Sequence, residues 1–258
     1  MDSRVTGRWA PSEVDRLAAR QAPVGAAVMY QRWRDLLFLH WEYPRDRLQA
    51  SLPAGLHVDT YQGKAYLGVV PFFMQGVRPR GLPAVPGISN FMELNLRTYV
   101  YDRSGVPGVW FYSLEANRRL AVAIARRFFH LPYVFARMTA GRSPSGAINY
   151  RAQRPGGSAH PRPCAFEYAA GPVLRRPEVD SLEFFLVERY RLFASANGRL
   201  WSGSVWHPPY PLHRAAVTIW DENLLALNGF EPTGRPPDHA VGSRGVDVAL
   251  YPLRRIQN

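Results

Sequence analysis

The stretch Phe91-Met-Glu-Leu-Asn-Leu-Arg-Thr-Tyr-Val-Tyr101 decides the fold of this chain. Two sets of side chains alternate along it, and a period of two residues predicts a β-strand. One face is apolar and must pack on a core. The opposite face carries Glu93, Asn95 and Arg97 in a row, between aromatic residues. This polar face is either solvated surface or the wall of a polar pocket.

Further short strands, bounded by turn residues, are expected on both sides of this stretch. They fall at residues 36–41, 56–61, 65–73, 108–114, 135–139, 146–151, 188–193, 200–206 and 246–251. Asn197-Gly198, between two of them, is a strong hairpin signal. The sequence has neither a βαβ rhythm nor an internal repeat. It therefore predicts an α+β fold built on an antiparallel, closed sheet.

A few short helices are expected beside this sheet, at residues 44–48, 115–129, 184–187 and 221–229. The second is the best candidate. Its apolar residues recur at helical spacing, which predicts a face that packs on the sheet. These residues are Leu120, Ala121, Ile124, Ala125 and Phe128.

The chain is expected to form one domain behind a short leader. Residues 1–22 are predicted to be a loose, peripheral leader with one short helix, for which Ser12 supplies the cap. Residues 23–258 are predicted to form a single domain. With 258 residues, of which 47% are hydrophobic, the chain can build a sizeable core.

The net charge of +12 suggests an anionic partner, but the distribution of charge argues against nucleic acid. Arginine supplies 31 of the 32 basic residues, and Lys64 is the single lysine. The arginines are scattered, and no nucleic-acid-binding motif is present. The charge is compatible with a small acidic ligand.

Several classes of protein are excluded by what the sequence lacks. It has no apolar run of the length that a membrane-spanning helix needs, and its N-terminus lacks the pattern of a signal peptide. We therefore expect a cytoplasmic protein without a membrane partner. Cys164 is the single cysteine, and the histidines lack the spacing of metal ligands. No glycine-rich phosphate motif follows a strand. No metal and no cofactor are predicted, and the oligomeric state stays open.

An ordered set of motifs resembles the bacterial YqjF-like family, also called DUF2071. The resemblance runs from about residue 30 to residue 253. The motifs are His40-Trp41, Val70-Pro-Phe72, Arg78-Pro-Arg-Gly-Leu-Pro83, Phe91-x-Glu-x-Asn-x-Arg-Thr-Tyr-Val100, Gly108-Val-Trp-Phe-x-Ser-Leu114, Leu131-Pro-Tyr133 and Glu188-Arg-Tyr190. That family is similar in fold to acetoacetate decarboxylase. The resemblance implies a conical antiparallel β-barrel with helices outside and a pocket inside.

The same resemblance implies which chemistry this chain lacks. Acetoacetate decarboxylases use a Schiff-base lysine beside a second lysine, in a Gly-aromatic-Pro-Lys-Lys segment. The matching segment here is His130-Leu-Pro-Tyr-Val134, so Tyr133 and Val134 stand where the lysines would be. Lys64 lies in a predicted surface turn. The pocket glutamate of that family matches Glu93.

Glu93 and Arg97 are the first candidates for function. A carboxylate beside aromatic side chains can have a raised pKa and act as an acid or a base. The alternative for Glu93 is a structural pairing with Arg97. Arg97 can bind a substrate carboxylate in bidentate fashion, with Asn95 beside it. The alternative for Arg97 is an ion pair with Glu115 or Glu188.

Four further residues complete the candidate site. Arg78 and Arg80 lie in a loop that is expected to cover the mouth of the sheet, or else to be solvated. Tyr133 offers a phenol that can donate a hydrogen bond to a substrate oxygen, or else packs in the core. Glu115 is a candidate for substrate contact or for a helix cap.

Three functions are therefore open. The first is a lysine-independent lyase, hydratase or isomerase for a small carbonyl or carboxylate compound. In it Glu93 is the acid or base, Tyr133 polarises an oxygen and Arg97, Arg78 or Arg80 binds the anion. The second is a ligand-binding or sensing module that has lost catalysis, as the missing lysine suggests. The third, a basic surface that binds nucleic acid or anionic lipid, ranks last.

Overall fold

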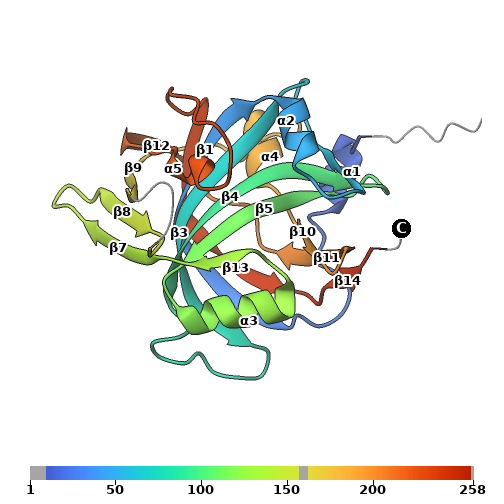
Figure 1. The fold of residues 1–258 in the computed structure, drawn as a ribbon, viewed down its shortest axis with the longest axis horizontal. Coiled ribbons are helices and arrows are strands. Elements are labelled where there is room, and N and C mark those ends of the chain that lie inside the picture. Colours follow the sequence, from blue (N-terminus) through green and yellow to red (C-terminus); the bar gives the residue numbers. More distant parts are fainter. Residues whose placement is uncertain (1–9, 157–161, 257–258) are drawn as a thin grey trace, which may run out of the picture.

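The computed structural model describes residues 10–156 and 162–256 and has an α+β architecture (Figure 1). The strands are β1 (Met29–Tyr43), β2 (Leu56–Val58), β3 (Ala65–Pro79), β4 (Phe91–Asp102), β5 (Pro107–Ala116), β6 (Tyr133–Phe135), β7 (Arg137–Arg142), β8 (Ile148–Gln153), β9 (Cys164–Val173), β10 (Arg191–Ala196), β11 (Arg199–Trp206), β12 (Leu212–Ile219), β13 (His239–Leu250) and β14 (Arg254–Arg255). The helices are α1 (Glu13–Ala18), α2 (Arg45–Ala50), α3 (Arg119–Phe129), α4 (Leu182–Val187) and α5 (Asn223–Ala226).

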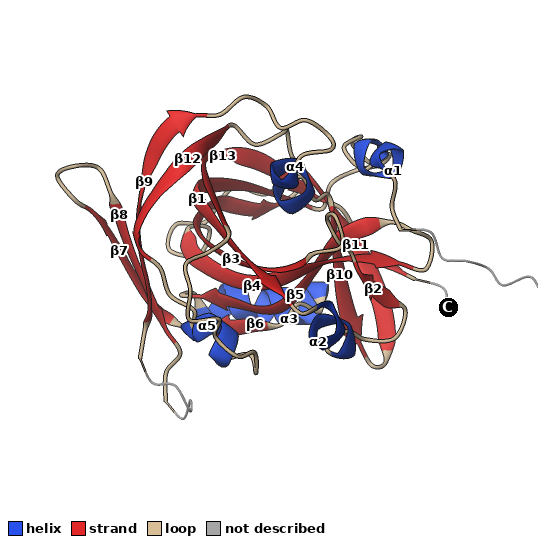
Figure 2. Ribbon diagram, turned by 90° about the horizontal axis from the view of Figure 1, so that it is seen from above, coloured by secondary structure: helices blue, strands red, loops and turns tan. Residues whose placement is uncertain are grey.

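Seven strands close into a ring of pairings. β11 pairs with both β10 and β13, and the path between them runs through β5, β4, β3 and β1. Figure 2 looks into this ring, with β12, β9, β8 and β7 extending outside it. The prediction of a purely antiparallel sheet is wrong, because β5 pairs in parallel with β6 and with β10. The crossover through α3 brings the chain back in the same direction, which makes β6 parallel to β5.

Both faces of β4 are buried, each in its own core. Phe91 and Tyr99 belong to the cluster that also contains Phe38 and Tyr210, on the face that looks into the ring. Met92, Leu94 and Leu96 belong to a second cluster, on the outer face, with side chains of β8, β9 and α5. The expectation that the apolar face packs on a core is confirmed. The polar face is equally covered, so it is not solvated surface.

α3 differs from the expected helix at its start and in its packing. β5 continues to Ala116, so the helix begins at Arg119 rather than at residue 115. Val122 is its buried residue, whereas Leu120, Ile124 and Phe128 are 52%, 37% and 65% exposed. This apolar face therefore packs in part only, through Ala121, Ala125 and Phe129 against the inner core.

The leader helix is present and is anchored to the domain. Ser12 caps α1 through a reciprocal pair of hydrogen bonds with Asp15, as predicted. The Arg16 guanidinium donates to both carboxylate oxygens of Asp59, at 2.6 and 2.7 Å, and Arg20 donates to Glu188 at 3.2 Å. The helix has no buried residue, and these ion pairs hold it against the surface of the domain. Residues 1–9 of the predicted leader lie outside the described residues.

Replacing Arg16 by Gln is expected to lower the free energy of unfolding by about 1–2 kcal/mol, because it removes two charge-assisted hydrogen bonds to a buried carboxylate. Urea unfolding monitored by tryptophan fluorescence measures the change. Arg45→Gln, at an exposed position of α2, is the matched control and is expected to change stability by less than about 0.5 kcal/mol. Equal effects of the two substitutions would contradict the anchoring of α1.

Candidate functional site

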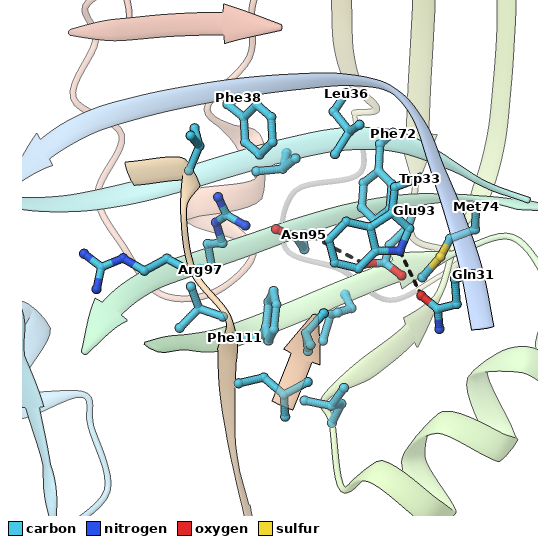
Figure 3. Close-up of a pocket in the computed structure, with 18 of the residues that line it drawn as sticks. Gln31, Trp33, Leu36, Phe38, Phe72, Met74, Glu93, Asn95, Arg97 and Phe111 are labelled. Atoms are coloured by element: carbon cyan, nitrogen blue, oxygen red, sulfur yellow. Dashed lines mark hydrogen bonds between the residues drawn. The ribbon is translucent and has the colours of Figure 1, made fainter. Parts of the chain in front are cut away.

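A cavity lies inside the ring of strands, against the polar face of β4 (Figure 3). The centre of a water molecule can occupy about 70 Å³ of it, which is room for a small ligand. Aliphatic and aromatic side chains form most of its wall. The polar or charged side chains of the wall, apart from its tryptophan and one tyrosine, are Gln31, Glu93, Asn95, Arg97, Tyr133, Arg189 and Arg191.

The register of β4 places the row Glu93, Asn95 and Arg97 on the cavity side. Glu93 pairs with Phe72 of β3, and Asn95 pairs with Val70; both partners also line the cavity. A bulge in β5 then shifts the pairing, so that Arg97 faces Phe111 of β5. One extra residue on a strand re-aims its side chains. The bulge brings Phe111 to the same side as Arg97, as Figure 3 shows.

Glu93 and Tyr133 form a buried pair at one end of the row. The Tyr133 hydroxyl donates to Glu93 Oε2 at 2.7 Å. Tyr133 is 7% exposed and Glu93 is 2% exposed. Burial raises the pKa of Glu93 to about 7, although the hydrogen bonds from Tyr133 and Asn95 lower it. Burial, with the nearby Glu93 charge, raises the pKa of Tyr133 well above its usual range. At neutral pH the tyrosine therefore stays protonated, while the carboxyl group is poised between its two forms.

The turn after α3 positions Tyr133. His130 ends the helix in the left-handed conformation, with a φ of 52°. The chain then enters β6, and Tyr133 pairs with Leu114 of β5, which also lines the cavity. The turn thus places Tyr133 in the wall of the cavity.

Asn95 and Arg97 carry polar atoms without partners. Asn95 donates to Glu93 Oε1 at 3.4 Å, which is long, and its Oδ1 is buried without a hydrogen-bond partner in the described chain. Arg97 donates to the Leu186 carbonyl at 3.2 Å, whereas its Nε has no partner. Buried polar atoms are almost always paired. An unpaired donor and an unpaired acceptor beside one cavity indicate a place for a polar ligand.

The Arg97 guanidinium has no carboxylate partner among residues 10–156 and 162–256. The alternative of an ion pair with Glu115 or Glu188 is wrong, because Arg154 pairs with Glu115 and Arg20 pairs with Glu188. Arg97 instead lies over the rings of Phe38 and Tyr99, at 5.4 and 5.6 Å. The charge of Arg97 is therefore not balanced by a carboxylate of the described chain.

Two further arginines in the wall were missed by the sequence reasoning. Arg189 pairs with Asp59 at 2.7 Å, and burial lowers its pKa to about 10. Arg191 lies farther along the same segment, and burial lowers its pKa as well. Arg189 falls in the motif Glu188-Arg-Tyr190, which was the signal available for it. Three arginines and one carboxylate, Glu93, are thus the charged residues that line the cavity.

Other candidates lie away from this cavity. Arg78 reaches the Gly76 carbonyl and the Tyr30 ring, Arg80 is exposed, and neither lines the cavity. Glu115 faces the other side of β5, where Ser113 and Arg154 donate to it. The structure thus brings Glu93, Asn95, Arg97 and Tyr133 together and leaves these three out. Lys64 lies in a surface turn, as expected, paired with Glu42 at 2.8 Å and with its side chain 55% exposed.

Neither a metal cluster nor a membrane helix is found in the described part of the chain. Within residues 10–156 and 162–256, no three His, Cys, Asp or Glu side chains gather as ligands for a metal ion. Every helix within those ranges is too short or too polar to cross a bilayer.

Several solved structures share the fold. An acetoacetate decarboxylase-like enzyme from Sphingomonas wittichii RW1 superposes with a TM-score of 0.61 at 16% identity, over 92% of this chain and 96% of that one. Acetoacetate decarboxylase from Legionella pneumophila gives a TM-score of 0.62 at 12% identity, over 100% and 98%. The enduracididine biosynthesis enzyme MppR, solved with pyruvate, gives 0.62 at 12% identity, over 92% and 93%. At these identities the likeness shows the fold alone.

Sequence comparison identifies the family. The uncharacterized protein YqjF of Bacillus subtilis (strain 168) is 38% identical over 236 residues, which cover 90% of this chain and 94% of that protein. The DUF2071 family model, described as an uncharacterized conserved protein, matches residues 30–247. The chain therefore belongs to the DUF2071 family, and its fold is that of the acetoacetate decarboxylase-like proteins.

Proposed function

We propose that this protein is a lysine-independent enzyme that transfers a proton at the carbon next to a carbonyl group in a small carboxylate compound, a 2-oxo or 2-hydroxy acid. Lyases, hydratases and isomerases that act through an enolate share this step. The observation that carries the proposal is the buried Glu93–Tyr133 pair in the same cavity as Arg97, a buried guanidinium without a carboxylate partner.

Glu93 is the acid or base in this proposal. A pKa of about 7 lets its carboxyl group both accept and return a proton near neutral pH. Tyr133 occupies Oε2 through its 2.7 Å hydrogen bond, whereas Asn95 approaches Oε1 at only 3.4 Å. Oε1 is therefore the oxygen left to receive the proton, and Tyr133 acts as a positioning residue that holds the carboxylate in place.

Arg97 and Asn95 bind the substrate in this proposal. The Arg97 Nε and a second N–H of its guanidinium suit a carboxylate in bidentate fashion. Asn95 lies between Arg97 and Glu93 on β4, where its side chain can accept from a hydroxyl group or, with the amide turned, donate to a carbonyl oxygen. A 2-oxo or 2-hydroxy acid carries a carboxylate for Arg97 and, on the adjacent carbon, a carbonyl or hydroxyl group for Asn95.

The proposed proton transfer needs no amine group. Glu93 takes a proton from the carbon next to the carbonyl, the C–H electron pair becomes a C=C bond, and the carbonyl π electrons move to the oxygen. That oxygen then carries negative charge, which the amide of Asn95 and the nearby arginines stabilise. The exposed Lys64 takes no part. The fold relative MppR, solved with pyruvate, supports a ligand of this size.

The test is exchange of the methyl protons of pyruvate in D₂O, followed by proton NMR. The wild-type protein is expected to exchange them faster than buffer. Tyr133→Phe is expected to slow the exchange about tenfold, since it removes a charge-assisted hydrogen bond to the base. Tyr112→Phe, in β5 but outside the cavity lining, is the control and is expected to leave the rate unchanged. Equal rates with wild-type protein and with buffer would refute the catalytic proposal.

A second candidate, a ligand-binding module, is favoured by the missing Schiff-base lysine. The same cavity would then hold a small acid without changing it. Binding of pyruvate in a calorimeter, together with an exchange rate equal to that of buffer, would decide for this candidate.

A further inference from the structure

A second, larger hollow lies between α3 and the segment at residues 79–91, which joins β3 to β4. Figure 1 shows this segment as a loop beside α3. The centre of a water molecule can occupy about 420 Å³ of it, so it is far roomier than the inner cavity. It opens to solvent as a groove. Its α3 wall consists of Leu120, Ala121, Ile124, Ala125 and Phe129.

The groove offers almost no polar group to a ligand. Gln31, Ser89 and Tyr133 are the lining residues with hydrogen-bonding side chains, and each is already engaged. Gln31 accepts from Trp33 at 2.8 Å, Ser89 accepts from the Val85 amide at 2.7 Å, and Tyr133 donates to Glu93. The remaining lining side chains are apolar, so the groove suits a hydrocarbon chain.

The groove and the inner cavity share one wall. The side chains that line both are Gln31, Met74, Leu131, Tyr133 and Leu250. The hydrocarbon chain of a ligand that passes this wall leads from the groove toward Glu93. Met74 is unbranched and flexible, so it can move aside for a ligand.

The rim of the groove is apolar and exposed. Leu82 and Val85 of the joining segment are 59% and 48% exposed, and Leu120 of α3 is 52% exposed. Exposed apolar patches of this kind mark binding sites. This face of α3 has the helical spacing that predicts packing, yet the protein leaves it partly uncovered.

We propose that the groove binds the apolar chain of the substrate, whose acid group enters the inner cavity at Arg97. The substrate class is then a 2-oxo or 2-hydroxy acid with an alkyl or aryl chain. This inference rests on the proposed function, because it assigns the acid end to the site on β4. The shared wall is the reason for this choice of ligand, because the polar inner cavity and the apolar groove meet there at Tyr133.

The test is a chain-length series of straight-chain 2-oxo acids, from pyruvate to the ten-carbon acid, bound in a calorimeter. Once the chain passes the shared wall, Kd is expected to fall about fourfold for each added methylene group. Ala125→Trp fills the groove and is expected to remove this dependence while leaving the Kd of pyruvate unchanged. Ala123→Trp, on the same helix but outside the groove, is the matched control and is expected to keep the dependence.

The outcomes separate this inference from the proposed function. Binding of pyruvate with no gain from longer chains would overturn the groove assignment and leave the proposed function standing. A gain that Ala125→Trp does not reduce would also overturn the assignment. A concentration-dependent dimer that Ala125→Trp dissociates, or flotation with phosphatidylglycerol vesicles that the same variant loses, would give the groove to another occupant. The proposed function fails separately, if the wild-type protein exchanges the methyl protons of pyruvate no faster than buffer does.

Discussion

Glu93→Gln is expected to be more stable than the wild-type protein by about 3 kcal/mol at pH 9, and to have nearly the same stability at pH 4. The reason is the cost of a buried negative charge. Burial raises the pKa of Glu93 from 4.5 to about 7, and each unit of pKa corresponds to 1.36 kcal/mol. Gln resembles the protonated carboxyl group and can still accept from Tyr133, so it avoids this cost at high pH.

The sign of this change of stability with pH follows from the protons that the folded and the unfolded states bind. Between pH 4.5 and about 7 the folded protein holds a proton on Glu93 that the unfolded chain has released. The contribution of Glu93 to stability is therefore fully present below pH 4.5 and is lost as the pH rises through 7. Above that range the wild-type protein carries the full penalty, and the difference from Glu93→Gln reaches its plateau.

Urea unfolding of both proteins at several pH values measures this difference. Glu42→Gln is the control of the same chemistry. Glu42 is 40% exposed and paired with Lys64, so its replacement is expected to change stability by at most about 0.5 kcal/mol at either pH. A difference for Glu93→Gln that does not grow with pH would contradict the raised pKa.

The same substitution is expected to slow proton exchange on pyruvate at least about a hundredfold, since it removes the base. A residue whose replacement stabilises the fold and abolishes activity is typical of an active site that is strained for function. A variant that gains stability at pH 9 but keeps the wild-type exchange rate would leave Glu93 as a buried structural carboxyl group.

The grouping of the site on β4 is predictable from the sequence, because alternation places residues two apart on one face. Glu93, Asn95 and Arg97 do line one cavity. Which face looks inward is not predictable from alternation. Both faces of β4 are buried, so the apolar face of Met92, Leu94 and Leu96 packs on the outer core and the polar face looks into the ring.

The rest of the site depends on long-range pairing, which no local pattern carries. Trp33 of β1 and Arg189, just before β10, reach the cavity because the ring closes through β11 and β13. The bulge that aims Phe111 at Arg97 depends on the register between β4 and β5. Glu115 has the right charge and lies near Glu93 in the sheet, yet its parity in β5 turns it to the opposite face, toward Arg154.

What covers the apolar face of α3 is also not predictable from a local pattern. Helical spacing of Leu120, Ile124 and Phe128 specifies an apolar face, but not what covers it. In most helices that cover is the protein's own core. Here the joining segment at residues 79–91 stands away from the helix and leaves the groove between them.

Arg97→Gln is expected to raise the Kd of pyruvate about a hundredfold, because a buried charge pair contributes about 2–5 kcal/mol to binding. The guanidinium lacks a carboxylate partner in the described chain, so its charge is available to a ligand. Stability is expected to change little. The substitution gives up the bond to the Leu186 carbonyl and contacts with two rings, but it also removes an uncompensated buried charge.

Calorimetry with pyruvate measures the loss, and Arg80→Gln, at an exposed position outside the cavity, is the matched control that should bind as the wild-type protein does. Arg97→Lys is expected to recover only part of the affinity, since an ammonium group lacks the planar fork that fits a carboxylate. Wild-type affinity in Arg97→Gln would show that the acid group binds elsewhere in the cavity, where Arg189 is held by Asp59 and Arg191 is the remaining guanidinium.

Because Arg97 shares β4 with Glu93, its position also determines which substrate carbon faces the base. A loss of affinity in Arg97→Gln with unchanged exchange at saturating pyruvate would therefore mean that Arg97 binds the acid without orienting it.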